Sequence, residues 1–222
     1  MTHIITGYYG SGKTEFVLNL ACEFAKTCNS NESITIADLD IINPFFRSRE
    51  CAKELAPLNI EVMGSIYENH VAQDIPALSF AFLSKIRSKQ KVIIDLAGGE
   101  NGLKLLTSCY DSITSHEFLC VFNLYRPETD TAKKMVDFCK QINIASRLPI
   151  TGLVNNGNLL AYTKPYHVLD SQKAVVEASL ELGIPLKYTL VQEGIYKQIA
   201  QKITSERVLT FSHPLMRKNW QS

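Results

Sequence analysis

The run G-Y-Y-G-S-G-K-T occupies residues 7–14. It matches G-x-x-x-x-G-K-[ST], the phosphate-binding motif known as the P-loop. The apolar residues 3–6 before it predict a short buried strand, and residues 15–28 after it predict a helix. A strand, a glycine-rich turn and a helix, in this order, are the context in which the motif binds phosphate. The start of the chain therefore predicts a nucleotide-phosphate site within an α/β fold.

Each residue type in this loop suits the binding of phosphate. Glycines let the backbone bend and approach a ligand without a Cβ in the way. The loop N–H groups can then form an anion site at a helix N-terminus. Lys13 is predicted to reach the β- and γ-phosphates, and the Thr14 hydroxyl to bind a Mg²⁺ ion that bridges phosphate oxygens. The predicted nucleotide-binding residues of this segment are Gly7, Gly10, Ser11, Gly12, Lys13, Thr14 and Glu15.

The overall composition excludes several function classes. The chain has 222 residues, 45% of them hydrophobic, and 23 Lys and Arg against 22 Asp and Glu give a net charge of +1. This balance provides no electrostatic reason to expect nucleic-acid binding. The apolar runs are only strand-sized, so no membrane-spanning helix is predicted. The first strand begins at residue 3 and leaves no room for a signal peptide, and we expect a cytoplasmic protein.

Six cysteines are scattered along the chain without a C-x-x-C pair. A zinc or iron–sulfur site within one chain is therefore not expected, although a cluster shared between two subunits stays open. Cys22, Cys120 and Cys139 fall in apolar patterns that predict small core residues. Cys109 lies in a polar stretch, and we expect it to be the most exposed thiol.

Strand and helix patterns alternate through most of the chain. The predicted strands are 3–6, 33–37, 60–63, 91–95, 118–124, 149–154 and 185–191, and the predicted helices are 15–28, 45–56, 74–88, 127–143, 168–182 and 195–203. This alternation predicts one three-layer α/β/α domain over residues 1–222, with a mostly parallel sheet. The tail from about residue 207 is poorly patterned, and its Trp220 is either a loose terminal residue or an anchor onto this or another subunit.

Polar motifs follow several predicted strands at their carboxyl ends, where parallel α/β proteins collect their ligands. Besides the P-loop, they are Asp38-Leu39-Asp40, the run from Asp95 to Gly99, Tyr125-Arg126-Pro127 and Asn155-Asn156. Several such strand ends indicate a nucleotide site more strongly than the P-loop alone.

Asp95 follows an apolar strand, which is the position of a Walker B acid, and we expect its carboxylate to hold Mg²⁺ through water. With Gly98 it also forms D-x-x-G. In nucleotide switches the glycine N–H of this motif contacts the γ-phosphate, and loss of that phosphate releases the loop. A solvated aspartate and a turn glycine are the structural alternative.

Asp38 and Asp40 lie two residues apart, so their side chains point the same way if the strand is regular. Neighbouring carboxylates repel each other, and we expect them near Mg²⁺, near Lys13, or with one turned outward. We assign Asp40 to positioning and polarising the attacking water, and Asp38 to the metal shell or a structural contact.

Asn155 and Asn156 lie where many P-loop proteins read the base. An asparagine amide both donates and accepts, which matches the N6 and N7 edge of adenine. The guanine-reading N-K-x-D tetrad is absent, because residues 155–158 are N-N-G-N. The pattern therefore favours ATP over GTP, with a polar turn as the alternative.

With these motifs the chain resembles the deviant-Walker class of P-loop ATPases, the MinD, ParA and CobQ type related to the nitrogenase iron protein. More narrowly, residues 38–47 resemble a run found in small clostridial-type ATP-binding proteins. The resemblance covers most of the chain and rests on residues 7–14, 38–40, 95–99, 126–129 and 155–156. It implies an ATP-dependent switch with slow Mg²⁺-dependent hydrolysis, often a homodimer when ATP is bound.

One position departs from that class. Its loop reads K-G-G-x-G-K-T, but Tyr8 replaces the signature lysine and Tyr9 the following glycine. The signature lysine reaches the phosphates of the partner subunit, so its loss puts this dimer mechanism in question. Arg47, Arg49 and Arg126 are the candidate substitutes, in cis or in trans. The branch containing CobQ and dethiobiotin synthetase also lacks the lysine.

Three functions remain open at this level. We favour an ATPase switch that acts on a protein client, for example in metallocofactor maturation or enzyme activation. The alternatives are a small-molecule kinase or ATP-dependent ligase, with a second pocket in residues 59–77 or 156–165, and a nucleotide sensor that does not hydrolyse. We expect ATP and Mg²⁺ as cofactors, a homodimer that can depend on nucleotide, and neither membrane nor nucleic acid as a partner.

Overall fold

The computed structural model describes residues 1–28, 33–39, 48–64, 80–87, 90–98, 102–103, 106–107 and 109–216. Some predicted features lie outside these residues: Asp40, Arg47, Gly99, Trp220, and residues 65–77 of the suggested second pocket. The side chain of Arg49 is likewise not described.

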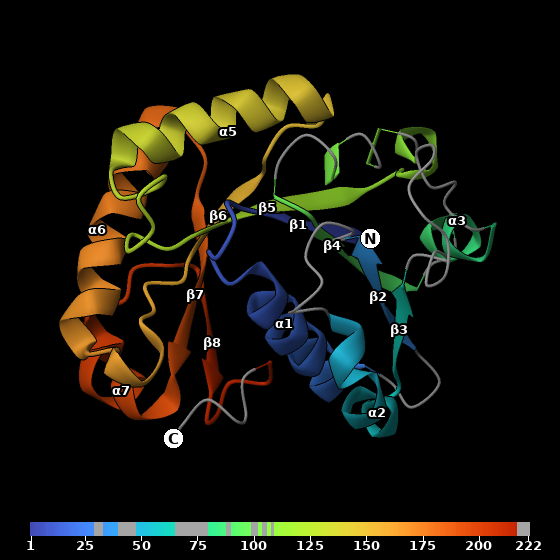
Figure 1. The fold of residues 1–222 in the computed structure, drawn as a ribbon, viewed down its shortest axis with the longest axis horizontal. Helices are drawn as coiled ribbons and strands as arrows, with labels where there is room; N and C mark the ends of the chain where they lie inside the picture. Colours follow the sequence, from blue (N-terminus) through green and yellow to red (C-terminus); the bar gives the residue numbers. More distant parts are fainter. Residues whose placement is uncertain are drawn as a thin grey trace.

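Within the described residues, eight strands form one parallel sheet (Figure 1). They are β1 (Thr2–Thr6), β2 (Ile34–Leu39), β3 (Ile60–Gly64), β4 (Lys91–Leu96), β5 (His116–Phe122), β6 (Gly152–Asn155), β7 (Leu186–Gln192) and β8 (Arg207–Phe211). Their order is β3-β2-β4-β1-β5-β6-β7-β8, and every neighbouring pair is parallel. The predicted parallel sheet is therefore confirmed.

Helices cover both faces of this sheet. The described helices are α1 (Lys13–Thr27), α2 (Ala52–Leu55), α3 (Phe80–Arg87), α5 (Ala132–Ser146), α6 (Pro165–Leu182) and α7 (Glu193–Ile199), with short 3₁₀ turns at Ser48–Cys51, Ala56–Leu58, Tyr110–Ser112, Leu160–Tyr162 and Ala200–Lys202. Figure 1 shows α1 and α2 on one side and α5 on the other. This arrangement confirms the three-layer α/β/α architecture. None of the described helices is both long and apolar enough to cross a membrane.

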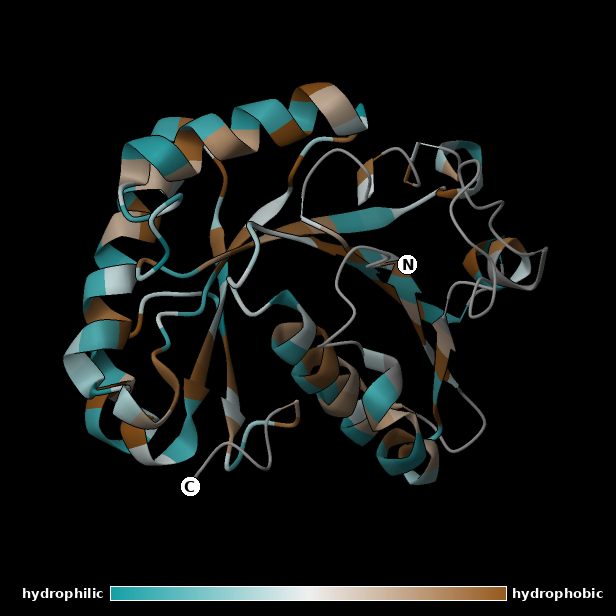
Figure 2. Ribbon diagram, in the orientation of Figure 1, coloured by the Kyte–Doolittle hydropathy of each residue, from teal (hydrophilic) through white to brown (hydrophobic). Residues whose placement is uncertain are grey.

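The alternation of side chains along the strands divides the core between the two faces. Ile36 on β2 and Ile93 on β4 pack with α1, whereas the next residues, Ala37 and Ile94, belong to the core under α5 and α6. In Figure 2 the central strands are mostly brown, and the peripheral helices alternate between brown and teal. Burial on both faces explains the continuous apolar runs of these strands.

The C-terminal part of the chain is more ordered than the sequence suggested. We predicted no element after residue 207, but β8 pairs in parallel with β7 at the edge of the sheet. Only Leu209 and Phe211 of this strand are buried. An edge strand with alternate burial carries a weaker apolar signal than a central strand, which is why the pattern was missed.

The helix after β5 also begins later than predicted. Pro127 suggested a helix start, but α5 begins at Ala132, where the Thr131 side chain accepts a hydrogen bond from the Lys134 N–H. Threonine at this position caps a helix effectively, so the helix starts there. Residues 123–131 instead form a turn at the carboxyl end of β5.

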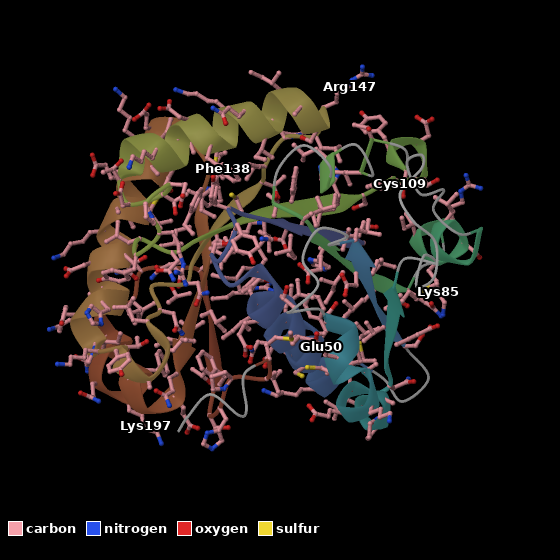
Figure 3. The ribbon with its side chains drawn as sticks, in the orientation of Figure 1. Glu50, Lys85, Cys109, Phe138, Arg147 and Lys197 are labelled. Carbon is pink, nitrogen blue, oxygen red and sulfur yellow. The ribbon has the colours of Figure 1, made fainter. Side chains whose placement is uncertain are left out.

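The expectation that Cys109 is an exposed thiol was wrong. Cys109 is only 1% exposed and its Sγ donates to the Leu106 carbonyl (Figure 3 shows its position). Burial raises the pKa of the Cys109 thiol to about 11. Cys120 and Cys139 are buried in the core as predicted, and Cys22 is half-buried. The six cysteines all lie in the described residues and none forms a disulfide.

A buried charge network lies at the amino ends of the strands, at the edge opposite the P-loop. Glu117 on β5 accepts from His3 on β1 and pairs with Lys187 on β7. Lys187 reaches across β6 because Gly152 has no side chain, and a Cβ there would lie 2.7 Å from Lys187 Cδ. Burial by itself raises the pKa of the Glu117 carboxyl, but His3 and Lys187 outweigh burial and hold the pKa at about 2.

Candidate nucleotide-binding site

The P-loop connects β1 to α1, and its backbone takes conformations that favour glycine. The φ angles of Gly7, Gly10 and Gly12 are +154°, +76° and +86°. A Cβ on Gly12 would also lie 2.2 Å from Nδ2 of Asn156, far inside normal contact distance. The structure thus requires glycine at position 12 for its backbone conformation and for space.

The N-terminus of α1 is open to a ligand. Gly12 occupies the N-cap position, and no side chain caps the helix. Lys13 is only 5% exposed, and its Nζ lies 3.4 Å from the Tyr8 carbonyl of the loop. Backbone N–H groups and the helix dipole make such an uncapped N-terminus suitable for an anion, and Lys13 adds a full positive charge.

A pocket of about 440 Å³ opens over this helix end. Its polar side includes Lys13, Thr14 and Arg126, and its apolar side includes Leu160 and Phe211. This volume falls within the range of about 300 to 1,000 Å³ that is usual for small-molecule sites. The fold therefore brings together the strand ends after β1, β5 and β6, as predicted, and adds the end of β8.

Asp38 and Asp95 occupy neighbouring positions in the sheet. They are register partners in the parallel pair of β2 and β4, and adjacent parallel strands lie about 4.8 Å apart. Asp38 continues the α1 side of β2 after Ile36, and Asp95 continues the α1 side of β4 after Ile93. Both carboxylates are buried, at 3% and 0% exposure. Both carboxylates thus lie on the sheet face that α1 covers. They lie near the carboxyl ends of β2 and β4, at the same edge of the sheet at which β1 leads into the P-loop.

The end of β4 lies directly against the P-loop. A Cβ on Gly98 would be 2.7 Å from the Gly7 carbonyl oxygen and 3.3 Å from the Tyr9 nitrogen. The segment that carries the D-x-x-G motif therefore contacts the backbone of the loop. Because the two segments are in contact, a displacement of one would displace the other.

The two asparagines after β6 have different environments. Asn155 is fully buried; its Nδ2 donates to the Val168 carbonyl and its Oδ1 accepts from the Gly157 N–H. Because Asn155 is fully buried and does not line the pocket, and its amide is bonded at both ends, the structure gives it a structural role. Asn156 faces the loop instead, donates to the Ser11 carbonyl at 2.8 Å, and lines the pocket.

Glu15 holds the C-terminal segment against α1. Its carboxylate accepts from the backbone N–H groups of Leu215 and Met216, at 2.8 and 3.0 Å, and from Asn19. Met216 lines the pocket, so the end of the described chain contributes to its wall. No sequence pattern indicated this contact, because a lone glutamate in a first helical turn is also typical of a solvated helix start.

Ser11, Tyr8 and Tyr9 of the loop have three different environments. Ser11 is fully buried and does not line the pocket. Its backbone N–H donates to the Tyr8 carbonyl and its carbonyl accepts from Asn156, so Ser11 stabilises the loop and does not contact the pocket. The Tyr8 ring packs against Phe138 of α5 at 5.8 Å (Figure 3 labels Phe138), whereas Tyr9 is 61% exposed at the pocket. Tyr8 is therefore an apolar anchor of the loop.

No family model matches the sequence, and no similar sequence was found among curated proteins. Solved structures do share this arrangement of strands and helices. The cell division protein FtsY from Thermotoga maritima is 22% identical, with a TM-score of 0.54 over 85% of this chain and 60% of its own. The chloroplast FtsY from Physcomitrella patens is 18% identical, with a TM-score of 0.57 over 85% of this chain and 57% of its own.

The fold is that of the P-loop NTPases. A third structural neighbour is a nucleotide-binding protein from Archaeoglobus fulgidus in complex with ADP. It is 18% identical, with a TM-score of 0.51 over 84% of this chain and 80% of its own. The chain spans only 60% and 57% of the two FtsY proteins. Likeness at these identities shows the P-loop NTPase fold and leaves the activity to be argued from the site.

Proposed function

We propose that this protein is a Mg²⁺-dependent ATP-binding and ATP-hydrolysing switch of the MinD, ParA and CobQ type, acting in the cytoplasm on a protein client. The observation that carries the proposal is the uncapped N-terminus of α1, where Lys13 and Thr14 open into a pocket of about 440 Å³. A helix end of this kind with a lysine is built to receive a phosphate chain.

The oxygen donors of Thr14, Asp38 and Asp95 suit a Mg²⁺ ion. Mg²⁺ prefers oxygen ligands and is usually held by one or two carboxylates together with substrate phosphates and water. Among the described residues, no three His, Cys, Asp or Glu side chains form a metal-binding group. The Thr14 hydroxyl and the carboxylates of Asp38 and Asp95 would therefore hold the ion together with the phosphates. Bound Mg²⁺ would neutralise phosphate charge.

The proposal favours ATP over GTP as the nucleotide. The guanine-reading tetrad is absent at residues 155–158, and one P-loop neighbour is in complex with ADP, although an FtsY neighbour is in complex with GDP. Asn156 lines the pocket, and its Oδ1 has no hydrogen-bond partner in the described part of the chain. An asparagine amide can both donate and accept, as the N6 and N7 edge of adenine requires, and of the two asparagines only Asn156 lines the pocket.

Hydrolysis and switching would involve the ends of β2 and β4. We propose that Asp40 positions the attacking water and that Gly98 senses the γ-phosphate. The close approach of Gly98 to Gly7 and Tyr9 supports a coupling between the phosphate site and this segment. A client protein, and a second copy of the chain, would then respond to the nucleotide that is bound.

Nucleotide titration tests this proposal directly. Calorimetry should detect binding of Mg·ATP and Mg·ADP, weaker binding of Mg·GTP, and loss of affinity when EDTA removes Mg²⁺. Lys13→Ala removes a charge-assisted phosphate contact and should weaken Mg·ATP binding by about 10- to 100-fold. The matched control is Lys197→Ala, an exposed lysine on α7 (Figure 3), which should bind like the wild type. A folded wild-type protein that binds no nucleotide would refute the proposal.

Turnover and assembly are tested separately. Asp40→Ala should retain Mg·ATP binding and release phosphate more slowly; an unchanged rate would remove Asp40 from its proposed role. Light scattering after size-exclusion chromatography of this variant should show a dimer with Mg·ATP and a smaller species with Mg·ADP. A monomer in every state would leave the ATP-dependent homodimer without support.

A further inference from the structure

Arg126 lies on the P-loop although 116 residues separate it from its contact there. Its Nε donates to the Gly10 carbonyl at 2.8 Å. A Cβ on Gly10 would meet Nε, Cζ and Cδ of Arg126 at 3.1, 3.4 and 3.6 Å, so the guanidinium end of the side chain lies over this glycine. Arg126 also lines the pocket together with Lys13.

The turn that carries Arg126 is held by buried hydrogen bonds. Asn123 directly follows β5, and its carbonyl accepts from the Arg126 N–H and from the Thr129 hydroxyl. The Asn123 amide donates in turn to the Asn158 carbonyl, and Thr129 is fully buried. Because the turn is already held in place, Arg126 loses little conformational entropy when a ligand binds in the pocket.

Among the described residues, Arg126 uses only a small part of its hydrogen-bonding capacity. A guanidinium has five N–H donors, and only Nε has a partner, since no other hydrogen bond or ion pair joins Arg126 to the described residues. The acidic group nearest in sequence within the pocket lining, Glu128, forms no ion pair with it in the described structure. The Glu15 carboxylate of the same pocket is engaged by backbone N–H groups of the C-terminal segment.

We infer that Arg126 is a second phosphate-binding cation of the pocket, which contacts the phosphate chain of a nucleoside di- or triphosphate through its terminal N–H groups. The inference rests on the proposed nucleotide-binding function and narrows the choice among the candidate arginines. Tyr8 provides no cation from the loop, because a tyrosine side chain carries no positive charge, and its ring packs against Phe138. Arginine suits this task because its planar fork can bind two phosphate oxygens at once.

The test compares Mg·ADP and Mg·AMPPNP affinities of the wild type with those of Arg126→Gln, Arg126→Lys and Arg147→Gln. Arg147 is exposed at the far end of α5 (Figure 3), so its replacement changes the net charge equally without touching the pocket. Arg126→Gln should weaken binding by about 10- to 100-fold, and Arg147→Gln should leave it unchanged. Arg126→Lys keeps the charge and should recover a large part of the lost affinity.

Salt dependence separates a phosphate contact from simple bracing of the loop. If Arg126 meets phosphate, the affinity of Arg126→Gln should fall less steeply with added NaCl than that of the wild type. Equal losses in the Lys and Gln variants with unchanged salt dependence would overturn the inference and leave Arg126 as a brace of Gly10. Wild-type affinity in Arg126→Gln would overturn it too, while the nucleotide-binding function would stand. A folded wild type that binds neither nucleotide would overturn both.

Discussion

Replacement of Gly12 by alanine should be far more damaging than replacement of a glycine with a similar backbone elsewhere. Gly12 and Gly183 both have left-handed backbones, with φ of +86° and +66°. A Cβ on Gly183 would meet nothing within 4 Å, whereas a Cβ on Gly12 would lie 2.2 Å from Nδ2 of Asn156. Gly183→Ala is therefore a matched control, because it shares the backbone strain without the collision.

The expected magnitudes follow from these contacts. A non-glycine residue in the left-handed region costs about 1 to 2 kcal/mol, which is the whole effect expected for Gly183→Ala. In Gly12→Ala the Asn156 amide must also move and lose its bond to the buried Ser11 carbonyl, which adds about 1 to 3 kcal/mol. Alanine at position 12 should also shift the strained backbone of the loop, and this shift should weaken Mg·ADP binding by at least about 10-fold, because the loop N–H groups no longer point towards the phosphates.

Urea unfolding followed by circular dichroism measures the stabilities, and calorimetry measures Mg·ADP affinity. Asn156→Ala removes the group that a Cβ at position 12 would strike, so the double variant with Gly12→Ala should be less destabilised than the sum of the two single variants. If Gly12→Ala were no less stable than Gly183→Ala and bound Mg·ADP like the wild type, the steric reasoning would be refuted. Strictly additive losses in the double variant would contradict the role assigned to Asn156.

Three further predictions concern other parts of the chain. Glu15→Gln should weaken the hydrogen bonds that Glu15 accepts from the backbone of residues 215–216 and speed hydrogen exchange there. Unchanged exchange would contradict the role of Glu15 in holding the C-terminal segment. Asp95→Asn should raise the Mg²⁺ concentration needed for nucleotide binding, as a Mg²⁺ titration at a fixed total ATP concentration would show. An unchanged Mg²⁺ requirement would remove Asp95 from the proposed metal site. The folded-state pKa of Glu117, about 2, lies below its ordinary 4.5, so the network stabilises the fold by about 3 kcal/mol above about pH 5 and loses this stabilisation as the pH falls towards 2. Unfolding measured against pH should show a flatter acid limb for Glu117→Gln, and identical acid limbs would refute the assignment.

The local features of the fold could be predicted from the sequence alone. The P-loop is a contiguous motif, and the helix predicted after it at residues 15–28 is present as α1, which begins two residues earlier, at Lys13, and ends at Thr27. The central strands β4 and β5 are continuous apolar runs because both faces of the sheet are covered. Alternation of such strands with helices allows few topologies, and the parallel sheet follows from it. Weakly patterned elements such as β8 escaped prediction, because an edge strand needs only its inner side chains to be apolar.

Only the tertiary structure could decide how the strand ends combine into a site. Asn155 and Asn156 are identical in composition and adjacent in sequence, yet one turns towards α6 and the other towards the P-loop. The contact of Arg126 with Gly10 joins residues far apart in the chain, and it exists because β5 lies next to β1 in the sheet. Such contacts depend on strand order and on the direction of each side chain. No local pattern encodes either, because both are fixed only when the whole sheet is packed.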